Sequence, residues 1–424
     1  MALGPRSASE RHALTPLDDV RDAIVSRVSA LKECDVALEH LHGCVLVTDF
    51  RAVVANPRFD NSAMDGFAVR SADVGDLPVR LRVVEQILAG RASARSIGSG
   101  EAARIMTGAP MPEGADAVVK IEDAEVDDGS ATVTLHGPVA RGQHVRYASE
   151  DVHVGDVVVS AGRRLGPIDV GVLASQGVTT LSARPRPVVG VISTGDELVQ
   201  GGPLASGQIF DTNRPMMLAL LEQWGYEAVD AGGVADDEDA IVARLDATIA
   251  RCDAVITTGG VSVGDADHVM LALRRLCPVS AVGLRVAIKP GKPMSFAVTD
   301  EGVPIFSLAG NPLAAVSLFH LVVRPALARR AGLAAAKARL VARLDVALSR
   351  RVDGRTHVVP ARVTVDSEAR LRVEAAWEAE SHRLRSAALA NALVLVPDGP
   401  GLRAGDLVEI ELTGGLVAGG RESE

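Results

Sequence analysis

The chain has 424 residues, of which 47% are hydrophobic and 23% charged, and its length exceeds what one hydrophobic core normally organises. The formal net charge of −10 argues against general binding to nucleic acid or to an anionic membrane. An aromatic content of 3% disfavours a surface on which bases or sugars stack. We therefore expect two to four globular domains.

The cysteines and the N-terminus favour a cytoplasmic protein. The four cysteines form no C-x-x-C pair and have no histidines at zinc spacing, so we expect reduced, buried thiols. No apolar run approaches the ~18 residues of a transmembrane helix. The start MALGPRSASERHAL lacks the pattern of a signal peptide.

The N-terminal part of the chain predicts a leader followed by a helix. Residues 1–13 are polar and without a pattern. A helix is expected from about residue 15, because Thr15 can cap it and Pro16 suits its first turn. Its apolar residues recur at helical spacing and form one stripe: Leu17, Val20, Ile24, Val28 and Leu31.

A change of character follows at about residue 45. Up to residue 148 the sequence consists of short valine-rich runs separated by Gly, Asp and Pro, which are typical of the strands of a small β domain. Residues 149–183 combine a strand with a short helix, and ARPRP at 183–187 has the composition of a linker.

Residues 188–330 have the alternating pattern of an α/β domain. The apolar run VVGVI is followed by a predicted helix with Asn213 as its cap and Gly225 at its end, and then by further strands and helices. Strands that are apolar on both sides indicate a parallel sheet with both faces covered. The remaining sequence returns to short alternating strands, which predict a compact barrel or sandwich.

The segment TTGGVSVGDADHV (257–269) is the first candidate for a ligand site. It follows an apolar strand, and at the carboxyl end of a parallel strand backbone N–H groups and the next helix favour an anion. Asp265 and Asp267 would repel a bare phosphate group, and a bridging Mg²⁺ removes this conflict. The alternative is an ordinary glycine-rich turn in which Asp265 caps the helix. The predicted phosphate contacts are Thr258, Gly259, Gly260, Ser262 and Gly264.

Two further loops are expected at the same edge of the sheet. STGDEL (193–198) follows VVGVI, and KPGKP (289–293) follows LRVAI, so the strand-end rule brings all three loops to one crevice. Lys289 and Lys292 supply cations there. The alternatives are a helix cap for Glu197 and a solvated turn for the lysines. The predicted metal ligands are Glu197, Asp265 and Asp267.

The β region contains two polar, sharply turning segments, NPRFDNSAMDGFAVR (56–70) and GEAARIMTGAPMPEGADAVV (100–119). Each can be read as a plain turn. Asp65 and Thr107 nevertheless stand where a loop can present a side chain to a cleft.

Eight segments together resemble one family. NSAMDGFAV, RIMTGAPMPEGADAVV, GQHVRYASEDV, STGDEL, GGVSVGDAD, KPGKP, AGNP and ANALVLVP resemble, in order, the motifs of the molybdopterin molybdenumtransferases, the molybdenum insertases to which the C-terminal domain of gephyrin also belongs. The resemblance covers essentially the whole chain from about residue 14. One such motif is of modest specificity, but eight in register are highly specific.

The resemblance implies a Mg²⁺-dependent transferase of molybdenum cofactor biosynthesis. Its substrates would be adenylylated molybdopterin and molybdate; the adenylate is cleaved, molybdenum remains on the dithiolene, and AMP leaves. Cleaving a phosphoanhydride requires in-line positioning and neutralised oxygen charge, which a metal and hydrogen-bond donors supply. The alternatives are a weakly catalytic or non-catalytic carrier of the molybdopterin nucleotide, and an enzyme that adenylylates molybdopterin with ATP.

The resemblance also implies a multidomain α/β plus β architecture. A discontinuous linking domain (14–50 and 149–183) would carry a β insertion domain (51–148). A central doubly wound parallel-sheet α/β domain (184–333) would bind the nucleotide, and a C-terminal β-barrel (334–424) would follow. Family members form homodimers in which the α/β cleft of one subunit faces the β insertion of the other, with transient contacts to other cofactor-biosynthesis proteins.

Residues carried over from the family complete the expected site. Ser262 and Asp267 would flank the nucleotide. Three positions depart from the family pattern: Ala309 replaces a proline, Arg285 replaces a lysine, and Glu380 precedes Ser381 in place of a glycine. The residues implied for activity are Asp65, Thr107, Glu197, Asp237 and Asp267, and those implied for molybdate are Lys289, Lys292, Arg355 and either Ser381 or Ser386.

Overall fold

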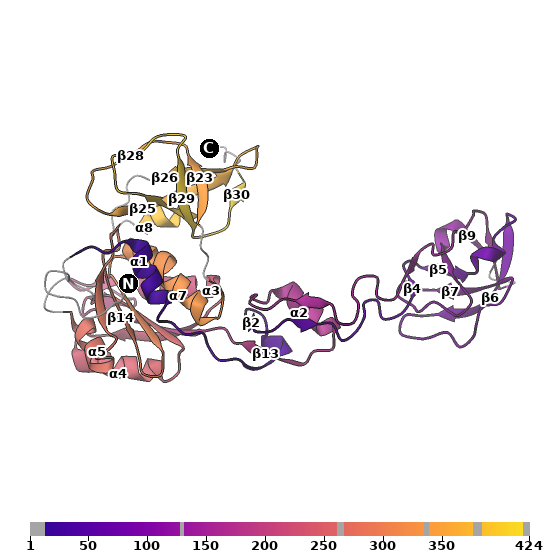
Figure 1. Cartoon of the computed structure of the whole chain (residues 1–424), viewed down its shortest axis with the longest axis horizontal. Helices are drawn as coiled ribbons and strands as arrows, with labels where there is room; N and C mark the ends of the chain where they lie inside the picture. The colour runs from indigo at the N-terminus through magenta and orange to yellow at the C-terminus, as the bar shows by residue number, and fades with distance from the viewer. Residues whose placement is uncertain (1–12, 128–130, 261–266, 335–338, 376–383, 419–424) are drawn as a thin grey trace. The chain divides into compact units, whose positions relative to one another are not determined.

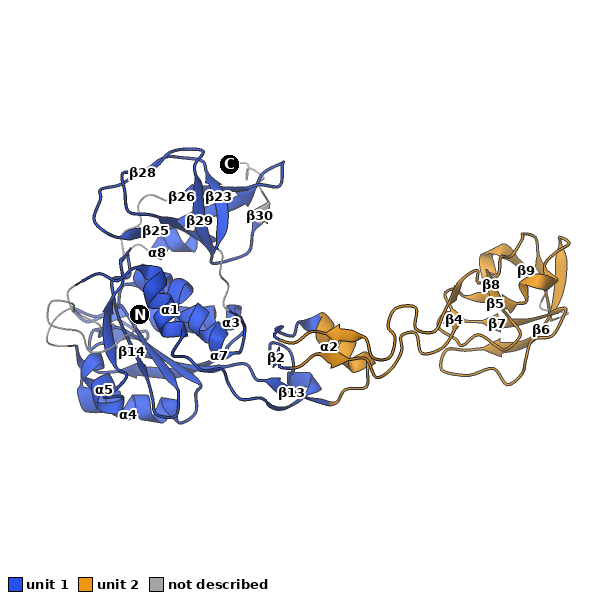
Figure 2. Cartoon of the chain, in the orientation of Figure 1, with its two compact units in different colours: residues 1–47, 162–167, 180–424 blue, residues 48–161, 168–179 orange. Residues whose placement is uncertain are grey.

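The computed structural model describes residues 13–127, 131–260, 267–334, 339–375 and 384–418. The chain divides into two compact units (Figure 2). Unit 1 comprises residues 1–47, 162–167 and 180–424, and unit 2 comprises residues 48–161 and 168–179. Unit 2 is therefore inserted into the sequence of unit 1, and each unit has hydrophobic clusters of its own.

A six-stranded sheet forms the centre of unit 1 (Figure 1). Its order is β17 (Glu227–Val234), β14 (Val188–Thr194), β18 (Ala254–Thr258), β22 (Pro304–Leu308), β21 (Pro293–Val298) and β19 (Val282–Arg285). The first four strands are parallel, and β21 is antiparallel to both of its neighbours. The predicted parallel core is confirmed, although β21 makes the complete sheet mixed. The carboxyl ends of β17, β14, β18, β22 and β19 lie along one edge, which we call the carboxyl edge.

Helices cover both faces of this sheet because its strands are apolar on both sides. Along β18, Ala254 and Ile256 belong to one core and Val255 belongs to the other. The first face is covered by α1 (Leu17–Val25), α3 (Asn213–Gln223), α6 (Pro312–Leu318), the π-helical η5 (Phe319–Val323) and α7 (Arg324–Arg330). The second is covered by α4 (Glu238–Ile249) and α5 (His268–Leu276).

The continuous helical run Pro312–Arg330 is long and apolar enough to cross a membrane, with a mean hydropathy of 1.2. However, 72% of it is buried inside the structure. Its residues Leu318, Phe319 and Val322 are fully enclosed in the core under the sheet. The run is thus a core helix of the α/β layer.

Two predicted helix starts are displaced by one or two residues. The backbone N–H of Thr15 donates to the Arg285 carbonyl, so Pro16 rather than Thr15 occupies the cap position of α1. Helix α3 begins at Asn213 itself, because the Asn213 amide donates to the Gly310 carbonyl instead of capping. The predicted end at Gly225 is confirmed by its φ of +77°, which glycine adopts without a steric penalty.

The C-terminal part of unit 1 is a closed barrel. Its strands follow the order β25 (Thr356–Val365), β26 (Leu371–Ala375), β23 (Leu340–Leu344), β29 (Leu407–Leu412) and β27 (Ala392–Val396), and β27 pairs back with β25. The choice between barrel and sandwich is thereby settled for a barrel, which leaves no open sheet edge. Short elements join it: β20 (Ile288–Lys289), β24 (Leu348–Ser349), α8 (Leu384–Ala388), β28 (Gly401–Leu402) and β30 (Val417–Ala418).

Unit 1 also contains a small sheet of β1 (Cys34–Ala37), β13 (Thr180–Arg184) and β2 (Val45–Leu46). Unit 2 is built on a six-stranded sheet of β8 (Ala117–Lys120), β5 (Gly66–Val69), β7 (Glu101–Ile105), β6 (Val79–Ile87), β10 (Thr132–Leu135) and β9 (Ala124–Asp127). Its remaining elements are β3 (Phe50–Arg51), β4 (Asn61–Ser62), β11 (Val145–Arg146), β12 (Val157–Val159) and most of α2 (Pro167–Ser175).

Candidate functional site

The turns that leave the parallel strands are bonded to one another along the carboxyl edge. The Gly195 N–H donates to the Val234 carbonyl at 3.3 Å, which joins the ends of β14 and β17. The Gly259 N–H donates to the Leu308 carbonyl at 3.3 Å, which joins β18 to β22. A third bond, from the Asn213 amide to the Gly310 carbonyl at 2.7 Å, fixes the start of α3 to the turn after β22. Strand-end loops that are distant in sequence are thus bonded to one another. We call these loops along the carboxyl edge, at Gly195, Val234, Gly259, Leu308 and Gly310, the rim.

The glycines after β18 allow the loops to approach this closely. Gly259 has a φ of +94°, and a Cβ added to it would lie 2.1 Å from the Thr194 carbonyl oxygen. At Gly260 a Cβ would lie 2.7 Å from the Thr194 hydroxyl and 2.6 Å from a Val269 methyl group. Real Cβ atoms do not approach other atoms so closely, so only glycine fits here. The sequence predicted Gly259 and Gly260 as phosphate contacts, and the structure shows that packing between loops already requires glycine at both positions.

Several buried hydroxyl groups at the strand ends have no hydrogen-bond partner within the described part of the chain. The hydroxyls of Thr194, Thr257, Thr258 and Ser307 are enclosed and unpaired. The Asn213 side-chain oxygen, beside the same rim, is also unpaired. Because buried polar groups are nearly always satisfied, such a concentration at one edge is typical of a site that acquires its partners from a ligand.

Acidic side chains gather at the β14 and β17 end of the rim. The backbone N–H of Asp236 donates to the Asp196 carboxylate at 3.1 Å. Burial and the nearby negative charges of Asp196 and Glu197 raise the pKa of Asp236 above its ordinary value. Glu197 is exposed and precedes the short strand β15 (Leu198–Val199), so the alternative that it caps a helix is wrong. A cation bound at this corner would relieve the mutual repulsion of these carboxylates.

Asp237 and Asp267 stand at the starts of helices on the same edge. Asp237 caps α4 by accepting from the Ala240 N–H at 2.8 Å, and Asp267 caps α5 by accepting from the Met270 N–H at 2.8 Å. Each carboxylate has a structural role that is independent of any ligand. The cap of α5 is thus Asp267 and not Asp265.

The predicted lysines flank the other end of the rim. Residue Met294 of β21 lies opposite Leu308, so Lys292 is close to the end of β22. Lys289 lies in β20, which pairs with the barrel strand β25 opposite His357. Three strand spacings separate β14 from β21, or about 14 Å. The edge is therefore acidic at one end and basic at the other, which suits an elongated ligand.

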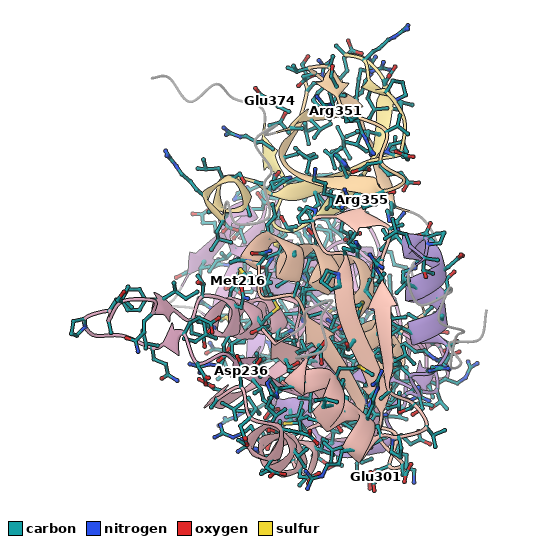
Figure 3. The ribbon with its side chains drawn as sticks, turned by 90° about the vertical axis from the view of Figure 1, so that its left-hand side faces the viewer. Met216, Asp236, Glu301, Arg351, Arg355 and Glu374 are labelled. Carbon is teal, nitrogen blue, oxygen red and sulfur yellow. The ribbon has the colours of Figure 1, made fainter. Side chains whose placement is uncertain are left out.

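Arg355 belongs to the basic end because β20 pairs with β25 directly beside it. Its guanidinium donates to the Asp353 carboxylate at 2.6 Å, and the His357 ring lies 3.2 Å from the same carboxylate. Although burial acts in the opposite direction, these hydrogen bonds lower the pKa of Asp353 to about 2. Figure 3 shows Arg355 at the end of the sheet nearest the barrel, and Glu301 at the opposite end.

Unit 2 brings together the two residues that the sequence singled out there. The Thr107 N–H and hydroxyl both donate to one oxygen of the Asp65 carboxylate, each at 2.7 Å. These bonds lower the pKa of Asp65 below its ordinary value. Both residues are exposed. The pair is thus a charged, preorganised feature of the surface of unit 2.

Some predicted site residues lie outside the described ranges, namely Ser262, Gly264, Asp265, Ser381 and the neighbouring Glu380. Among the residues that the structure describes, no group of three His, Cys, Asp or Glu side chains converges on a metal position. The metal ligands predicted from the sequence therefore remain a prediction.

Sequence reasoning missed Asn213 and Asp236 as site residues. Asn213 had the signal of a helix cap, and Asp236 lies in an acidic run typical of a helix start. Thr194 and Gly310 were visible only as parts of STGDEL and AGNP. Their roles depend on contacts between loops, which no local pattern encodes.

The fold and the rim are typical of a class of proteins in which an α/β domain takes an anionic, nucleotide-like ligand beyond the carboxyl ends of its parallel strands. Three family profiles cover the chain. The MoeA N-terminal region (domain I and II) matches residues 15–177, the probable molybdopterin binding domain matches 190–329, and the MoeA C-terminal region (domain IV) matches 342–413. The chain belongs to the molybdopterin molybdenumtransferase family.

Individual relatives agree with this assignment. The molybdopterin molybdenumtransferase of Staphylococcus aureus is 33% identical over 95% of this chain and 97% of its own length. That of Haemophilus influenzae is 36% identical over 74% and 78%. A crystal structure of the molybdopterin biosynthesis MoeA protein from Pyrococcus horikoshii superposes with a TM-score of 0.72 at 29% identity, covering 95% of this chain and 100% of that one. The predicted family, fold class and transferase role in molybdenum cofactor biosynthesis are confirmed.

Proposed function

We propose that the rim is the reaction site, where molybdenum is transferred to adenylylated molybdopterin with Mg²⁺-dependent cleavage of the adenylate and release of AMP. The observation that carries this proposal is the row of buried hydroxyls, at Thr194, Thr257, Thr258 and Ser307, that have no partner among the described residues and lie between an acidic and a basic end. A pterin nucleotide has phosphate oxygens for these donors, and molybdate is an oxyanion suited to the lysines.

The acidic end fits a magnesium ion that is completed by its substrate. Mg²⁺ usually keeps several waters and takes only one or two carboxylates together with phosphate oxygens. Glu197 and Asp236 offer carboxylates there, and the pKa of Asp236 is raised by burial and by the nearby negative charges of Asp196 and Glu197, which a bound cation would offset. When bound, the ion would neutralise charge on the phosphoanhydride that breaks as AMP leaves.

The protein's own residues position the two substrates. The Thr194 and Thr258 hydroxyls donate to phosphate oxygens, and the loop that Gly259 permits holds the nucleotide against the rim. Lys289, Lys292 and Arg355 hold molybdate at the basic end, with Asp353 fixing the orientation of the Arg355 guanidinium. Asp267 remains the cap of α5 and positions that helix start toward the nucleotide.

The test follows AMP release from purified protein that is mixed with adenylylated molybdopterin, Mg²⁺ and molybdate. We expect AMP release to be stimulated by molybdate and to fall by at least a hundredfold in Glu197→Gln, as for loss of an electrostatic contact made at the reacting group. The matched control is Asp246→Asn, an exposed carboxylate further along α4, which leaves the rate unchanged. Tight nucleotide binding without molybdate-stimulated AMP release would instead identify a carrier.

We also propose that the active form is a cytoplasmic homodimer in which the Asp65–Thr107 pair of one subunit acts at the rim of the other. Asp65→Asn and Glu197→Gln variants would each be inactive alone. After unfolding and refolding as a mixture, half of the dimers would carry one variant of each kind and one intact site, which restores about a quarter of wild-type activity. A mixture that stays inactive while forming mixed dimers contradicts the shared site.

A further inference from the structure

A cavity lies in unit 1, away from the rim. It has a volume of ≈ 280 Å³ and is walled by α3 and the α6–η5 run on one side and by α8 and β27 of the C-terminal barrel on the other. In Figure 3, Met216 lies between Asp236 and the barrel. Two of the lining residues, His320 and Thr413, are polar. The others are apolar: Met216, Leu220, Val316, Leu384, Ala387, Ala388, Ala390, Ala392 and Leu393.

His320 is the feature that points to a ligand. Its side chain is 0% exposed, and neither ring nitrogen has a hydrogen-bond partner among the residues that the structure describes. Burial, aided by the nearby Arg324 charge, lowers the pKa of His320 to about 3. The ring is therefore a neutral imidazole with one donor and one acceptor, both unsatisfied. Leaving such a group unpaired costs about 1–3 kcal/mol.

The surroundings hold this ring in a fixed orientation. Trp224 and Phe319 contact it edge to face, with ring centroids 5.8 and 5.3 Å away. Arg324 stacks on the Trp224 ring and pairs with Glu411 of the barrel, so the aromatic cluster is anchored from both sides of the cavity. His320 also lies within the π-helical turn η5, an irregularity that is frequent at functional sites.

The position of the cavity separates it from the reaction site. Met216 and Leu220 are three and seven residues beyond Asn213 on α3, or about 4.5 and 10.5 Å along the helix axis. Asn213 marks the rim through its bond to Gly310. The cavity therefore begins one helical turn behind the rim, and it is lined by hydrocarbon rather than by the hydroxyls and charges of the rim.

We propose that this cavity binds a small, neutral molecule with an apolar body and a single hydroxyl or amide group that hydrogen-bonds to His320. An engineered cavity of 150 Å³ holds benzene, so ≈ 280 Å³ corresponds to a ligand of roughly ten to twelve non-hydrogen atoms. Charged groups are excluded because the cavity offers them no counter-ion. The bound molecule would contact the α/β domain and the barrel together.

The test compares two molecules of almost equal size, 2-naphthol and 2-methylnaphthalene, in titrations of the full-length protein. Two-bond ¹H–¹⁵N spectra of the histidine rings report hydrogen bonding at His320 directly. We expect both molecules to bind, with 2-naphthol tighter by about fivefold, which corresponds to about 1 kcal/mol for one hydrogen bond. Only 2-naphthol should shift a ring nitrogen of His320.

Two variants complete the test. His320→Phe keeps an aromatic ring without nitrogen atoms and should remove the preference for 2-naphthol while both molecules still bind. Ala387→Leu, on the barrel side, should fill the cavity and weaken both molecules at least tenfold. Molybdate-dependent AMP release should be unchanged in Ala387→Leu, so failure here is distinct from failure of the proposed reaction.

The proposal is overturned if neither molecule binds saturably, which would show that solvent alone satisfies His320. It is also overturned if both molecules bind equally to the wild type, or if Ala387→Leu binds them as the wild type does.

Discussion

The closest packing at the rim can be tested by adding a single methyl group. Gly259→Ala combines two costs: a φ of +94°, and a Cβ placed 2.1 Å from the Thr194 carbonyl oxygen. The backbone conformation alone costs about 1–2 kcal/mol in a residue with a side chain. The contact involves backbone on both sides and cannot be relieved by rotating a side chain, so we expect a total loss of about 3 kcal/mol or more in the free energy of unfolding.

Two other glycines of unit 1 separate these costs. Gly207 has a φ of +87° with nothing within 4 Å of an added Cβ, so Gly207→Ala should lose only the conformational part, about 1–2 kcal/mol. Gly283 has neither problem, and Gly283→Ala should change stability by less than about 0.5 kcal/mol.

The assay is urea unfolding of the full-length protein, followed by its tryptophan fluorescence, to which Trp224 at the end of α3 contributes, together with molybdate-dependent AMP release. We expect Gly283→Ala to be the most stable of the three variants, Gly207→Ala to be intermediate and Gly259→Ala to be the least stable. AMP release should be lost in Gly259→Ala alone. If Gly259→Ala is as stable as Gly207→Ala, the close approach of the β14 and β18 turns is not a constraint, and the reasoning about the rim is wrong.

Three further predictions concern the rim and its basic end. The pKa of Asp353 is about 2 in the folded protein and ordinarily 3.8, so its hydrogen bonds stabilise the barrel above about pH 4, and this stabilisation is lost as the pH falls toward 2. The urea midpoint of Asp353→Asn should lack that part of the pH dependence of the wild type. Parallel curves of urea midpoint against pH would contradict the pairing. Asn213→Ala removes the hydrogen bond to Gly310, so it should lower the free energy of unfolding by about 1 kcal/mol and raise the KM for the pterin nucleotide. An unchanged KM would show that Asn213 is not part of the site. Lys289→Ala should raise the half-saturating molybdate concentration about tenfold, as expected for the loss of one charge-assisted hydrogen bond. The control variant Arg351→Ala should leave this concentration unchanged. Equal effects of the two variants would mean that only the net charge matters.

The family and the parallel α/β core could be predicted from the sequence because they depend on local patterns. The apolar run at 188–192 predicted a strand that is buried on both faces, and Ile192 and Val191 indeed belong to opposite cores. Asp65 and Thr107 could be chosen from their turns, but their hydrogen bonds could not, since the two residues belong to different strand ends.

The helix starts show where local patterns fail. Asn213 has the composition of a cap, but its amide is taken by Gly310, almost a hundred residues away in the sequence. Asp236 looked like one more acidic residue at a helix start, and its pKa is raised by burial and by the charges of Asp196 and Glu197 in the turn after β14, which only the folded chain brings to it.

The sequence by itself determined the family, the alternation of strands and helices, and the positions of glycines and charged residues at strand ends, because periodicity and turn composition are properties of neighbouring residues. The tertiary structure alone decided that Thr194 packs against Gly259 and that the edge is acidic at one end and basic at the other. It also decided that His320 lies in an apolar cavity with no hydrogen-bond partner in the part of the chain that the structure describes. These features arise where segments distant in sequence meet, and hydrogen-bond satisfaction and steric exclusion act only at that contact.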